Sequence, residues 1–581
     1  MKKQILTYIL LFFQGIWLGY GQVSDNGEVN SSEIPHENIF IHYNTTLLLS
    51  GEYLYYKVYC RNASSNGESL ISKIAYVTLV GEDGASVFQH KIVLEAGSGQ
   101  GDFFVPVSVK SGNYKLIGYT QWMKNKGIEH FFQGDISIIN PYLSDQSAIL
   151  KGANDTLQTQ VKSKGSLFSD GETGTLSLKD SVLNTRNKVV LTLEGQSKSK
   201  IKGDYSLSVR KVDPFAVSPP ISFKTFNPLI LEKPEDTNDT FYIPEMRGDL
   251  ISGMVKFNDK SLRRDAKVVV SIPGENAVTK VANIDGSGNF LINLDKPYDS
   301  NQAIFQVLDQ EKDVFNITLD NNDLFDYSGL SFYNFSLTPQ LEDELLKKSI
   351  HNQIENAFFS VKPDTLAITE PSRPAYLDKM QFYNLDEYTR FPTVQETLIE
   401  IVTNVFPRRI GKDNYRIQVR NYIEDTYIPP NAQPLLLVDG ILIQDHKYLL
   451  KYDSRKIKRI GVLQDKYILG MQIFQGVVIM ETIDGDFKLP VNDNYVVPLE
   501  LAKPLDKKKY FSPTYGDSIS TKDRIPDYRH QLLWKPEVKI TDKDTSFVFY
   551  TSDVEGTFEI RLEGFSASGE PISLHKNFRV K

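Results

Sequence analysis

Short runs of aromatic and β-branched residues, separated by clusters of glycine, aspartate and asparagine, recur along most of this 581-residue chain. Such runs are typical of β-strands, and the clusters between them have the composition of turns. Near the N-terminus the clearest strands are 53–59 and 74–80, and the clearest turns are 81–84 and 97–101. Strands at this spacing indicate β-sandwiches. We therefore expect a mainly β protein made of tandem immunoglobulin-like β-sandwiches.

Length and charge narrow the classes of protein further. A chain of 581 residues is expected to fold as several domains, because a domain usually contains about 100–200 residues. The 65 lysine and arginine residues face 73 acidic residues, which gives a formal charge of −8. A net-acidic chain without a dense basic run argues against a nucleic-acid partner. The single cysteine, Cys60, excludes an intrachain disulfide bond and a multi-cysteine metal cluster.

The N-terminus has the features of a signal peptide. Two lysines precede an apolar stretch at 5–17, and Gly19 and Gly21 lie just before the expected cleavage site at Gln22. The apolar stretch is shorter than the roughly 20 residues of a bilayer span, and no later segment reaches that length. We therefore expect a signal peptide at 1–21 and an exported mature chain with no transmembrane segment of its own.

Changes in composition and in apolar periodicity along the mature chain predict a series of domains and linkers. One convincing helix is expected between Thr338 and Phe359, where apolar residues recur at helical intervals. Residues 363–374 and 490–526 read as connecting sequence. The expected units are a flexible leader (22–38), a first β-sandwich (39–141), a second β-sandwich (142–245), a third β-sandwich (246–320), a helix with a linker (321–374), a small domain (375–487), a second linker (488–526) and a C-terminal β-rich domain (527–581).

The segment 375–487 differs from the rest because it mixes helical and strand patterns. Residues 393–405 are a candidate helix that ends near Pro407. The apolar run 434–438 leads into Asp439-Gly440, which has the chemistry of a hairpin turn. This mixture predicts a small α+β domain. Its further expected strands are 441–443, 457–462 and 476–482.

Three stretches of the first expected sandwich resemble a known domain. They are Ser50 to Tyr53, Gly101 to Phe103, and Ser111 to Tyr114 leading into Tyr119 to Met123. Together they resemble the second macroglobulin-type domain (MG2) of alpha-2-macroglobulin-like proteins, in the version common in Bacteroidetes envelope proteins. The reactive Cys-Gly-Glu-Gln loop of that family is absent from this sequence, so covalent trapping of proteases is excluded. Cys60 lies in an aromatic strand, and we expect it to be a small buried apolar group.

Three stretches of the α+β segment, 434–440, 457–463 and 476–482, resemble the plug domain of TonB-dependent receptors. In such receptors the plug closes a barrel of about 22 strands, each about 10 residues long. Only 94 residues, 488–581, follow Phe487. We therefore expect a plug-like domain without its barrel, in a chain that is not itself a transporter.

Two weaker resemblances indicate the same group of proteins. Residues 250–295 are similar to the carboxypeptidase-regulatory-like β-sandwich, mainly through the turn Asp285 to Phe290, and 525–529, 534–536 and 549–553 resemble the tail of the same envelope family. The resemblances imply a non-enzymatic protein associated with the outer membrane, on its periplasmic face or at the cell surface. The partner they imply is an outer-membrane β-barrel protein or another envelope subunit, in TonB-linked transport, barrel assembly or secretion.

A search for catalytic, cofactor-binding and metal-binding residues finds no usable motif. His36-Glu37 begins like a zinc-protease helix, but Phe40 stands where the second histidine would be needed. No nucleophile elbow, phosphate loop or dinucleotide fingerprint occurs in a strand–turn–helix setting. Tyr119 and Trp122 are interpreted as core aromatics and not as a ligand platform. We therefore expect a protein that is not an enzyme, with no catalytic residue, cofactor or metal site.

Two polar patterns have an alternative, functional interpretation. Asp320 to Asp323 with Asp326 form an oxygen-rich cluster that suits Ca²⁺, but its spacing fails the EF-hand pattern, so we interpret it as a solvated turn. Tripeptides of an acidic, a hydroxyl and an aliphatic residue resemble the O-glycosylation signal of exported Bacteroidetes proteins. They are Asp155-Thr156-Leu157, Asp180-Ser181-Val182, Asp364-Thr365-Leu366 and Asp517-Ser518-Ile519.

Two other functions stay open at the level of sequence. The first is a surface glycan-binding protein or glycan hydrolase, which needs clustered carboxylates and aromatic side chains along a cleft. The second is a secreted cargo protein, because 556–560 and 578–581 resemble a C-terminal sorting domain of the Bacteroidetes secretion route. The last strands of any β-sandwich look similar, so the second alternative rests on fold analogy.

Overall fold

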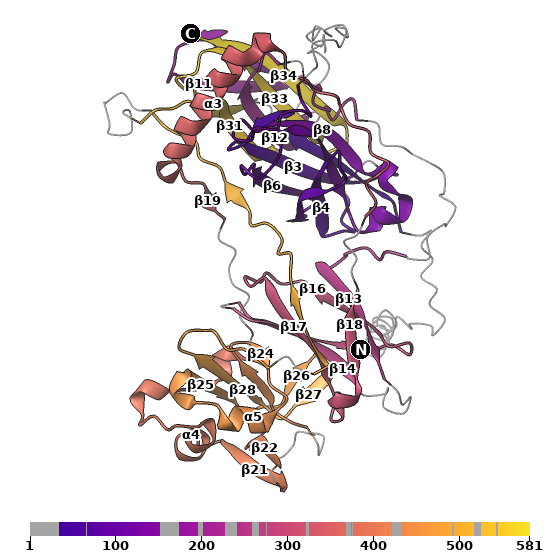
Figure 1. Ribbon diagram of the computed structural model, residues 1–581, viewed down its shortest axis with the longest axis vertical. Helices are drawn as coiled ribbons and strands as arrows, with labels where there is room; N and C mark the ends of the chain where they lie inside the picture. Colours follow the sequence, from indigo (N-terminus) through magenta and orange to yellow (C-terminus); the bar gives the residue numbers. More distant parts are fainter. Residues whose placement is uncertain are drawn as a thin grey trace, which may run out of the picture. The chain divides into compact units, whose positions relative to one another are not determined.

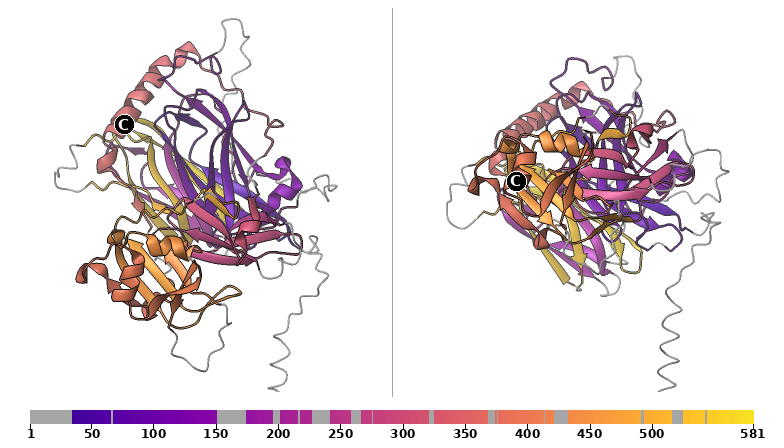
Figure 2. Two further views of the ribbon diagram at one scale, coloured as in Figure 1. Left: turned by 60° about the horizontal axis from the view of Figure 1, so that its bottom comes forward. Right: turned by 90° about the horizontal axis from the view of Figure 1, so that it is seen from below.

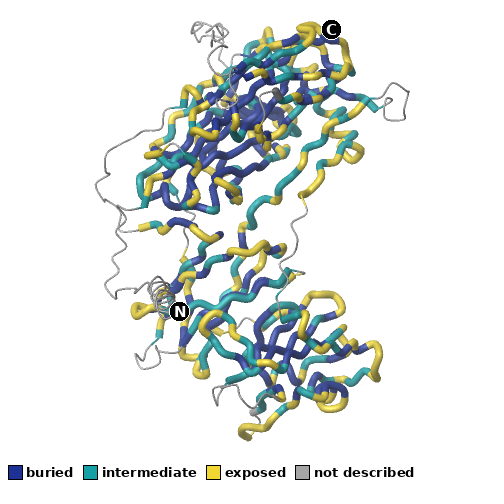
Figure 3. The backbone as a smooth tube through the Cα atoms, turned by 180° about the vertical axis from the view of Figure 1, so that it is seen from behind, coloured by how far each residue is buried: buried dark blue, intermediate teal, exposed yellow. Residues whose placement is uncertain are grey.

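β-Strands form most of the secondary structure, as the aromatic and β-branched runs predict. The computed structural model describes residues 34–581 except 66, 151–173, 196–200, 216, 227–240, 258–265, 275, 321–324, 368–373, 375, 413, 421–431, 491–492, 516–524 and 542–543. The expected signal peptide lies outside the described residues. Burial is concentrated along the strands, whereas the connecting loops are largely exposed (Figure 3). Within the described part of the chain, no helix has both the length and the apolar character needed to cross a membrane.

The first β-sandwich forms where it is expected, from strands whose aromatic and β-branched residues are mostly buried. Its three-stranded sheet has the order β1-β3-β6, and its five-stranded sheet has the order β2-β8-β7-β4-β5. Every residue of the expected strand 74–80 is buried. The strands are β1 (Glu37–Tyr43), β2 (Leu47–Leu49), β3 (Tyr53–Asn62), β4 (Ile74–Gly81), β5 (Ser86–Val93), β6 (Ser98–Phe104), β7 (Gly112–Tyr119) and β8 (Phe132–Ile139).

The second β-sandwich joins two distant parts of the chain. Strand β12 lies between β31 and β33, and β11 lies between β9 and β32. Figure 1 shows the yellow strands β31 and β33 beside β12, with β34 on the far side of β33, and Figure 2 shows yellow strands running along purple ones. The strands are β9 (Gly174–Leu178), β10 (Val182–Leu183), β11 (Lys188–Gly195), β12 (Gly203–Lys211), β31 (Gln531–Ile540), β32 (Asp544–Tyr550), β33 (Gly556–Ser566) and β34 (Pro571–Val580).

This pairing corrects the expected division into a second sandwich at 142–245 and a separate C-terminal domain at 527–581. The buried and exposed residues alternate along both β11 and β31. Alternation shows that each strand has one apolar face to cover, but it does not say which other strand covers it. Neither segment completes a core alone, and together they enclose one hydrophobic cluster.

The third β-sandwich also recruits a strand from a segment that was expected to be a linker. Strand β29 pairs with β17 at the edge of the sheet β15-β14-β17-β29, although it lies within the expected linker 488–526. The turn at Asp285 forms as expected, because its carboxylate accepts hydrogen bonds from the backbone N–H groups of Ser287 and Asn289, both at 2.8 Å. The strands are β13 (Asp249–Lys256), β14 (Lys267–Ile272), β15 (Val278–Asn283), β16 (Asn289–Leu294), β17 (Gln302–Leu308), β18 (Asn316–Leu319) and β29 (Val496–Glu500).

The segment 375–487 folds as an α+β domain around the sheet β20-β25-β28-β23-β24, in which β23 and β28 are parallel. Asp439 and Gly440 have φ values of 47° and 83° and form the expected turn between β23 and β24. The candidate helix 393–405 is shorter than expected, because β21 begins at Val405. The elements are β20 (Gln381–Asn384), α4 (Val394–Glu400), β21 (Val405–Gly411), β22 (Asn414–Val419), β23 (Leu435–Val438), β24 (Ile441–Leu442), α5 (His446–Lys451), β25 (Ile457–Leu463), β26 (Tyr467–Leu469), β27 (Gln472–Phe474) and β28 (Val477–Thr482).

The expected helix is α3 (Glu342–Ala357), within the predicted bounds. The two expected linkers that follow it pair with each other, because β19 (Thr365–Leu366) forms an antiparallel ladder with β30 (Lys508–Lys509). The carboxylate of Asp364 also accepts a hydrogen bond from the backbone N–H of Phe511, at 2.8 Å. Lys508 also forms an ion pair with Asp102 of β6 at 2.9 Å, so this ladder lies beside the first sandwich.

Candidate functional site

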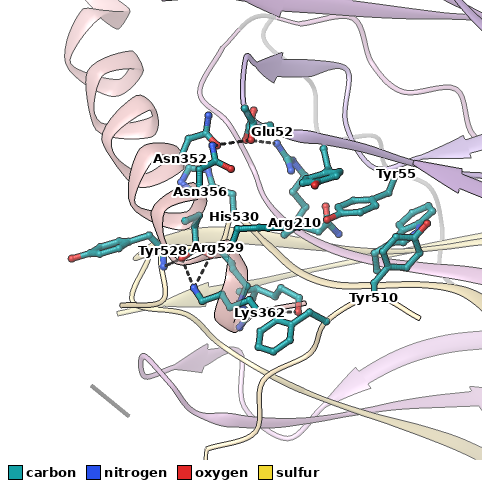
Figure 4. Close-up of a pocket in the computed structure, with 18 of the residues that line it drawn as sticks. Glu52, Tyr55, Arg210, Asn352, Asn356, Lys362, Tyr510, Tyr528, Arg529 and His530 are labelled. Carbon is teal, nitrogen blue, oxygen red and sulfur yellow. Dashed lines mark hydrogen bonds and ion pairs between the residues drawn. The ribbon is translucent and has the colours of Figure 1, made fainter. Parts of the chain in front are cut away.

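A pocket with a volume of about 150 Å³ lies where α3 meets the first two sandwiches (Figure 4). The start of β3 contributes one part of its lining, and β12, α3, β31 and the chain after β30 contribute the others. Apart from the chain after β30, which leads into β31, these segments are far apart in the sequence. The pocket therefore exists only because the tertiary structure brings them together.

Two asparagines of α3 hold the helix against the first sandwich. The side-chain amides of Asn352 and Asn356 donate hydrogen bonds to the carbonyl oxygens of Ser50 and Gly51, at 2.8 and 3.1 Å. Gly51 has a φ of +92°, and a Cβ atom there would lie 2.6 Å from the amide nitrogen of Asn356. The close approach of helix and turn thus requires glycine at position 51.

Charged side chains of alternating sign form the floor of the pocket. The carboxylate of Glu52 lies 3.1 Å from the guanidinium of Arg210 and 3.5 Å from the ammonium of Lys348. Lys348 also forms an ion pair with Asp213 at 2.7 Å. None of the four side chains is more than 11% exposed, so each charge depends on its partners inside the protein. Together these ion pairs connect β3, β12 and α3.

Two histidines lie beside this charged floor. Nδ1 of His351 is 3.1 Å from Nε2 of His530. Burial, aided by Lys211 and Lys347, lowers the pKa of His351 to about 4. Burial and the neighbouring Lys348 also hold the pKa of His530 well below its ordinary value. Both rings are neutral near pH 7, and such weak bases are poorly matched to proton transfer at that pH.

Aromatic rings form the opposite wall. Tyr55 stacks on Tyr53 and on Trp534, with ring centroids 5.6 and 6.1 Å apart, and Tyr510 meets Tyr55 edge to face at 4.9 Å. Phe359, which follows α3, also stacks on Tyr53, with ring centroids 6.1 Å apart. Burial, with Asp102 and Asp364 nearby, raises the pKa of Tyr53 to about 12, so its phenol is protonated. The wall is a platform for stacking and supplies no charge.

The carboxylates along the rim already have donors within the protein. Glu355 accepts hydrogen bonds from the ammonium of Lys362 at 2.8 Å and from the backbone N–H of Tyr528 at 2.6 Å. Burial raises the pKa of Glu355 and of Asp364. The pocket therefore combines aromatic and carboxylate side chains, which suits binding of a small polar ligand better than acid–base chemistry.

Exposed apolar side chains mark a second region, on the α+β domain. The hairpins β21–β22 and β26–β27 carry exposed Phe406, Ile410, Ile468 and Met471, the last of which is 76% exposed. At these exposed positions the apolar side chains contribute nothing to a core. Such side chains are typical of surfaces that contact another molecule.

The residues that the sequence analysis considered for a functional role are mainly buried in the protein core. Cys60 is fully buried, and burial raises the pKa of its thiol well above the ordinary value. Tyr119 and Trp122 are buried, as predicted for core aromatics. Glu37 is also buried, and its carboxylate accepts hydrogen bonds from Ser69, Ser72 and Thr120.

The oxygen-rich cluster at 320–326 and the glycosylation-like tripeptides lie only partly within the described residues. Asp320 accepts a hydrogen bond from the hydroxyl of Ser252, but 321–324 lie outside the described residues. Where the chain is described, no three histidine, cysteine, aspartate or glutamate side chains gather as metal ligands. Ser181 and Thr365 of the glycosylation-like tripeptides are exposed, whereas the tripeptides 155–157 and 517–519 lie outside the described residues.

No sequence pattern predicts this pocket. Arg210, Lys348 and His530 come from distant segments and belong to no motif. One local signal was present, since Lys348, Asn352 and Asn356 recur at intervals of four residues along α3 and so form a polar stripe on one side of the helix. A polar stripe of that kind indicates a helix that docks on polar backbone groups.

Comparisons with known proteins give distant likenesses in structure alone. The sequence matches no protein-family model and no curated protein. A point mutant of Salmonella alpha-2-macroglobulin aligns over 94% of this chain and 39% of its own, with 9% identity and a TM-score of 0.23. The native Escherichia coli alpha-2-macroglobulin aligns over 94% of this chain and 40% of its own, with 10% identity and a TM-score of 0.23. The Yersinia pseudotuberculosis adhesin InvE aligns over 48% of this chain and 58% of its own, with 10% identity and a TM-score of 0.14. The chain thus spans about two fifths of the macroglobulin chains. Likeness at this level bears on neither activity nor partners.

Proposed function

We propose that this protein is an exported, non-enzymatic cell-envelope protein that works by binding other proteins, as an accessory subunit of an outer-membrane β-barrel complex. The sequence supports export through its N-terminal signal features and supports the partner through the plug resemblance of 434–482. The complex would serve TonB-linked transport, barrel assembly or secretion. The plug-like domain would contact the barrel from the periplasmic face or from the cell surface.

The observation that carries this proposal is how the α+β domain is attached to the third sandwich. It is inserted between β18 and β29 of the third sandwich, and β29 returns to pair with β17. The side chain of Gln306 on β17 donates a hydrogen bond to the carbonyl oxygen of Leu442 at 2.8 Å, and the hydroxyl of Ser271 accepts one from the N–H of Leu442 at 3.1 Å. A domain fixed in this way presents its hairpins in a defined orientation.

The proposal is tested by purifying the tagged full-length protein from its native envelope in mild detergent. A specific interface of about 1,200–2,000 Å² should survive gentle solubilisation, so a β-barrel protein should copurify. The double variant Ile468→Glu and Met471→Glu places two charges on the β26–β27 hairpin and should remove that partner. A matched control is Leu291→Glu on β16, which is also an exposed apolar position. Recovery of the protein without any barrel protein, or equal loss in the control, would contradict the proposal.

The pocket favours one other function, binding of a surface glycan. Its aromatic wall and its carboxylates are the combination that a glycan site needs. Soluble oligosaccharides should then bind the full-length protein and bind more weakly to Tyr510→Ala. Hydrolysis of a glycan that disappears in Glu355→Gln would instead identify an enzyme and overturn the non-enzymatic proposal. The cargo alternative has less support, because β33 lies within the second sandwich and pairs with β12 and β34.

A further inference from the structure

The hairpin β21–β22 has two chemically different faces. Its inner face carries Val405, Ile417 and Val419, which belong to the hydrophobic core of the α+β domain. The N–H of Ile417 also donates a hydrogen bond to Nδ1 of His446 on α5, at 2.8 Å. Side chains alternate across a strand, so the residues between these point to the outer face. The outer pairs across the two strands are Phe406 with Gln418 and Arg408 with Arg416.

Arg408 and Arg416 lie directly opposite each other, which places two positive charges on the same face. Like charges in this position destabilise a β-ladder. Three more cations, Arg409, Lys412 and Arg420, belong to the same hairpin and its exit. These five cations and Asp413 give the segment 405–420 a formal charge of +4, in contrast to the −8 of the whole chain.

No acidic group in the described part of the chain pairs with Arg408 or Arg416. The helices packed against the inner face contribute Glu396, Glu400 and Asp445, and none of these forms an ion pair with the hairpin. The acid of the hairpin itself, Asp413, lies outside the described residues. Among the described residues nothing offsets the repulsion between Arg408 and Arg416, and an anionic partner would relieve it.

Apolar side chains lie among these cations. Phe406 is 38% exposed and Ile410 is 48% exposed. A hairpin that needed only solubility would carry polar residues at these positions.

We propose that the outer face of β21–β22 docks on an anionic phospholipid surface. The arginines would bind phosphate oxygens, for which the planar guanidinium is suited, and Phe406 and Ile410 would enter the interface beneath the headgroups. A phospholipid bilayer presents both environments side by side, with phosphates above apolar chains. The hairpin is a two-stranded surface, so a flat partner on its outer face reaches Arg408 and Arg416 together. This contact is separate from the protein–protein docking proposed above, since it requires no barrel protein.

The test is flotation of the purified full-length protein with lipid vesicles. The protein should bind vesicles that contain about one third phosphatidylglycerol and should not bind vesicles of phosphatidylcholine alone. Binding should weaken at about 0.5 M NaCl, where charges are screened within a few ångströms. The double variant Arg408→Gln and Arg416→Gln should bind about 25-fold more weakly, because each cation near an anionic surface contributes about a factor of five.

Two controls separate lipid binding from a folding defect or a general charge effect. Removing the Arg408–Arg416 repulsion should leave the melting temperature of the double variant unchanged or higher. The matched variant Lys179→Gln and Lys188→Gln removes two exposed cations from the second sandwich and should bind vesicles like the wild type. Equal binding to neutral and anionic vesicles, equal weakening in both double variants, or binding of polyglutamate in place of vesicles would overturn the proposal.

Discussion

At the scale of single residues, Glu245 is an unusual buried acid. Its carboxylate accepts hydrogen bonds from the hydroxyl of Tyr76 and the N–H of Leu250, both at 3.1 Å, and its Oε2 atom has no partner among the described residues. The nearby cation, Lys91, instead pairs with Asp249 at 2.8 Å. Burial, together with the charge of Asp249, raises the pKa of Glu245 to about 8.

The raised pKa predicts a loss of stability in alkaline solution. The folded protein keeps the proton of Glu245 above the ordinary carboxyl range, so the stabilisation is complete below about pH 4.5 and is lost as the pH rises through about 8. Glu245→Gln has no charge to bury and should raise the melting temperature by several degrees at about pH 8.5, corresponding to about 1–3 kcal/mol. Scanning calorimetry at about pH 5 should show almost no difference. A difference of equal size at both pH values would contradict this assignment.

At the scale of elements, the turn between β23 and β24 depends on Asp439. Its carboxylate accepts hydrogen bonds from the N–H and hydroxyl of Thr482, at 2.8 and 2.5 Å, and from the N–H of Phe487 at 3.1 Å. One side chain thus joins the turn to the end of β28 and to the chain that follows it. Asp439 also has a φ of 47°, a value that aspartate and asparagine tolerate better than most residues.

Asp439→Ala should therefore destabilise the α+β domain by about 2–4 kcal/mol, since it leaves two backbone N–H groups unpaired and strains the turn. Asp439→Asn keeps one oxygen and the tolerance for positive φ, so its effect should be smaller, about 1 kcal/mol. Hydrogen exchange of the β23 and β28 amides measures both effects locally. Equal protection of these amides in the alanine variant and the wild type would show that the carboxylate does not hold the turn.

At the scale of the whole molecule, the second sandwich depends on both halves of the chain. Residues 527–581 contain four strands that pair with β9–β12 or with one another. Deleting this segment should therefore unfold 174–211 as well, because the buried faces of β11 and β12 would lose their cover. Limited proteolysis of the truncated protein should cut within 174–211, and coexpression of 527–581 as a separate chain should restore protection. A truncated protein that resists cleavage there would show that the two segments fold independently.

Patterns confined to a short stretch of sequence determined much of the local structure. The strands at 53–59 and 74–80, the helix between Thr338 and Phe359, and the turn at Asp439-Gly440 all form as predicted. Each depends on side-chain periodicity or on the dihedral preferences of a few neighbouring residues. Such signals do not need the rest of the chain.

The tertiary structure alone decided which strands pair and where the pocket lies. Every strand edge offers the same backbone N–H and carbonyl groups, so the local pattern of β12 does not select β31 as its neighbour more than 300 residues away. That choice depends on how the apolar faces of all the strands fit into one core. The ion pairs of Glu52 with Arg210 and Lys348 follow from the same choice, because they exist only after β3, β12 and α3 have met.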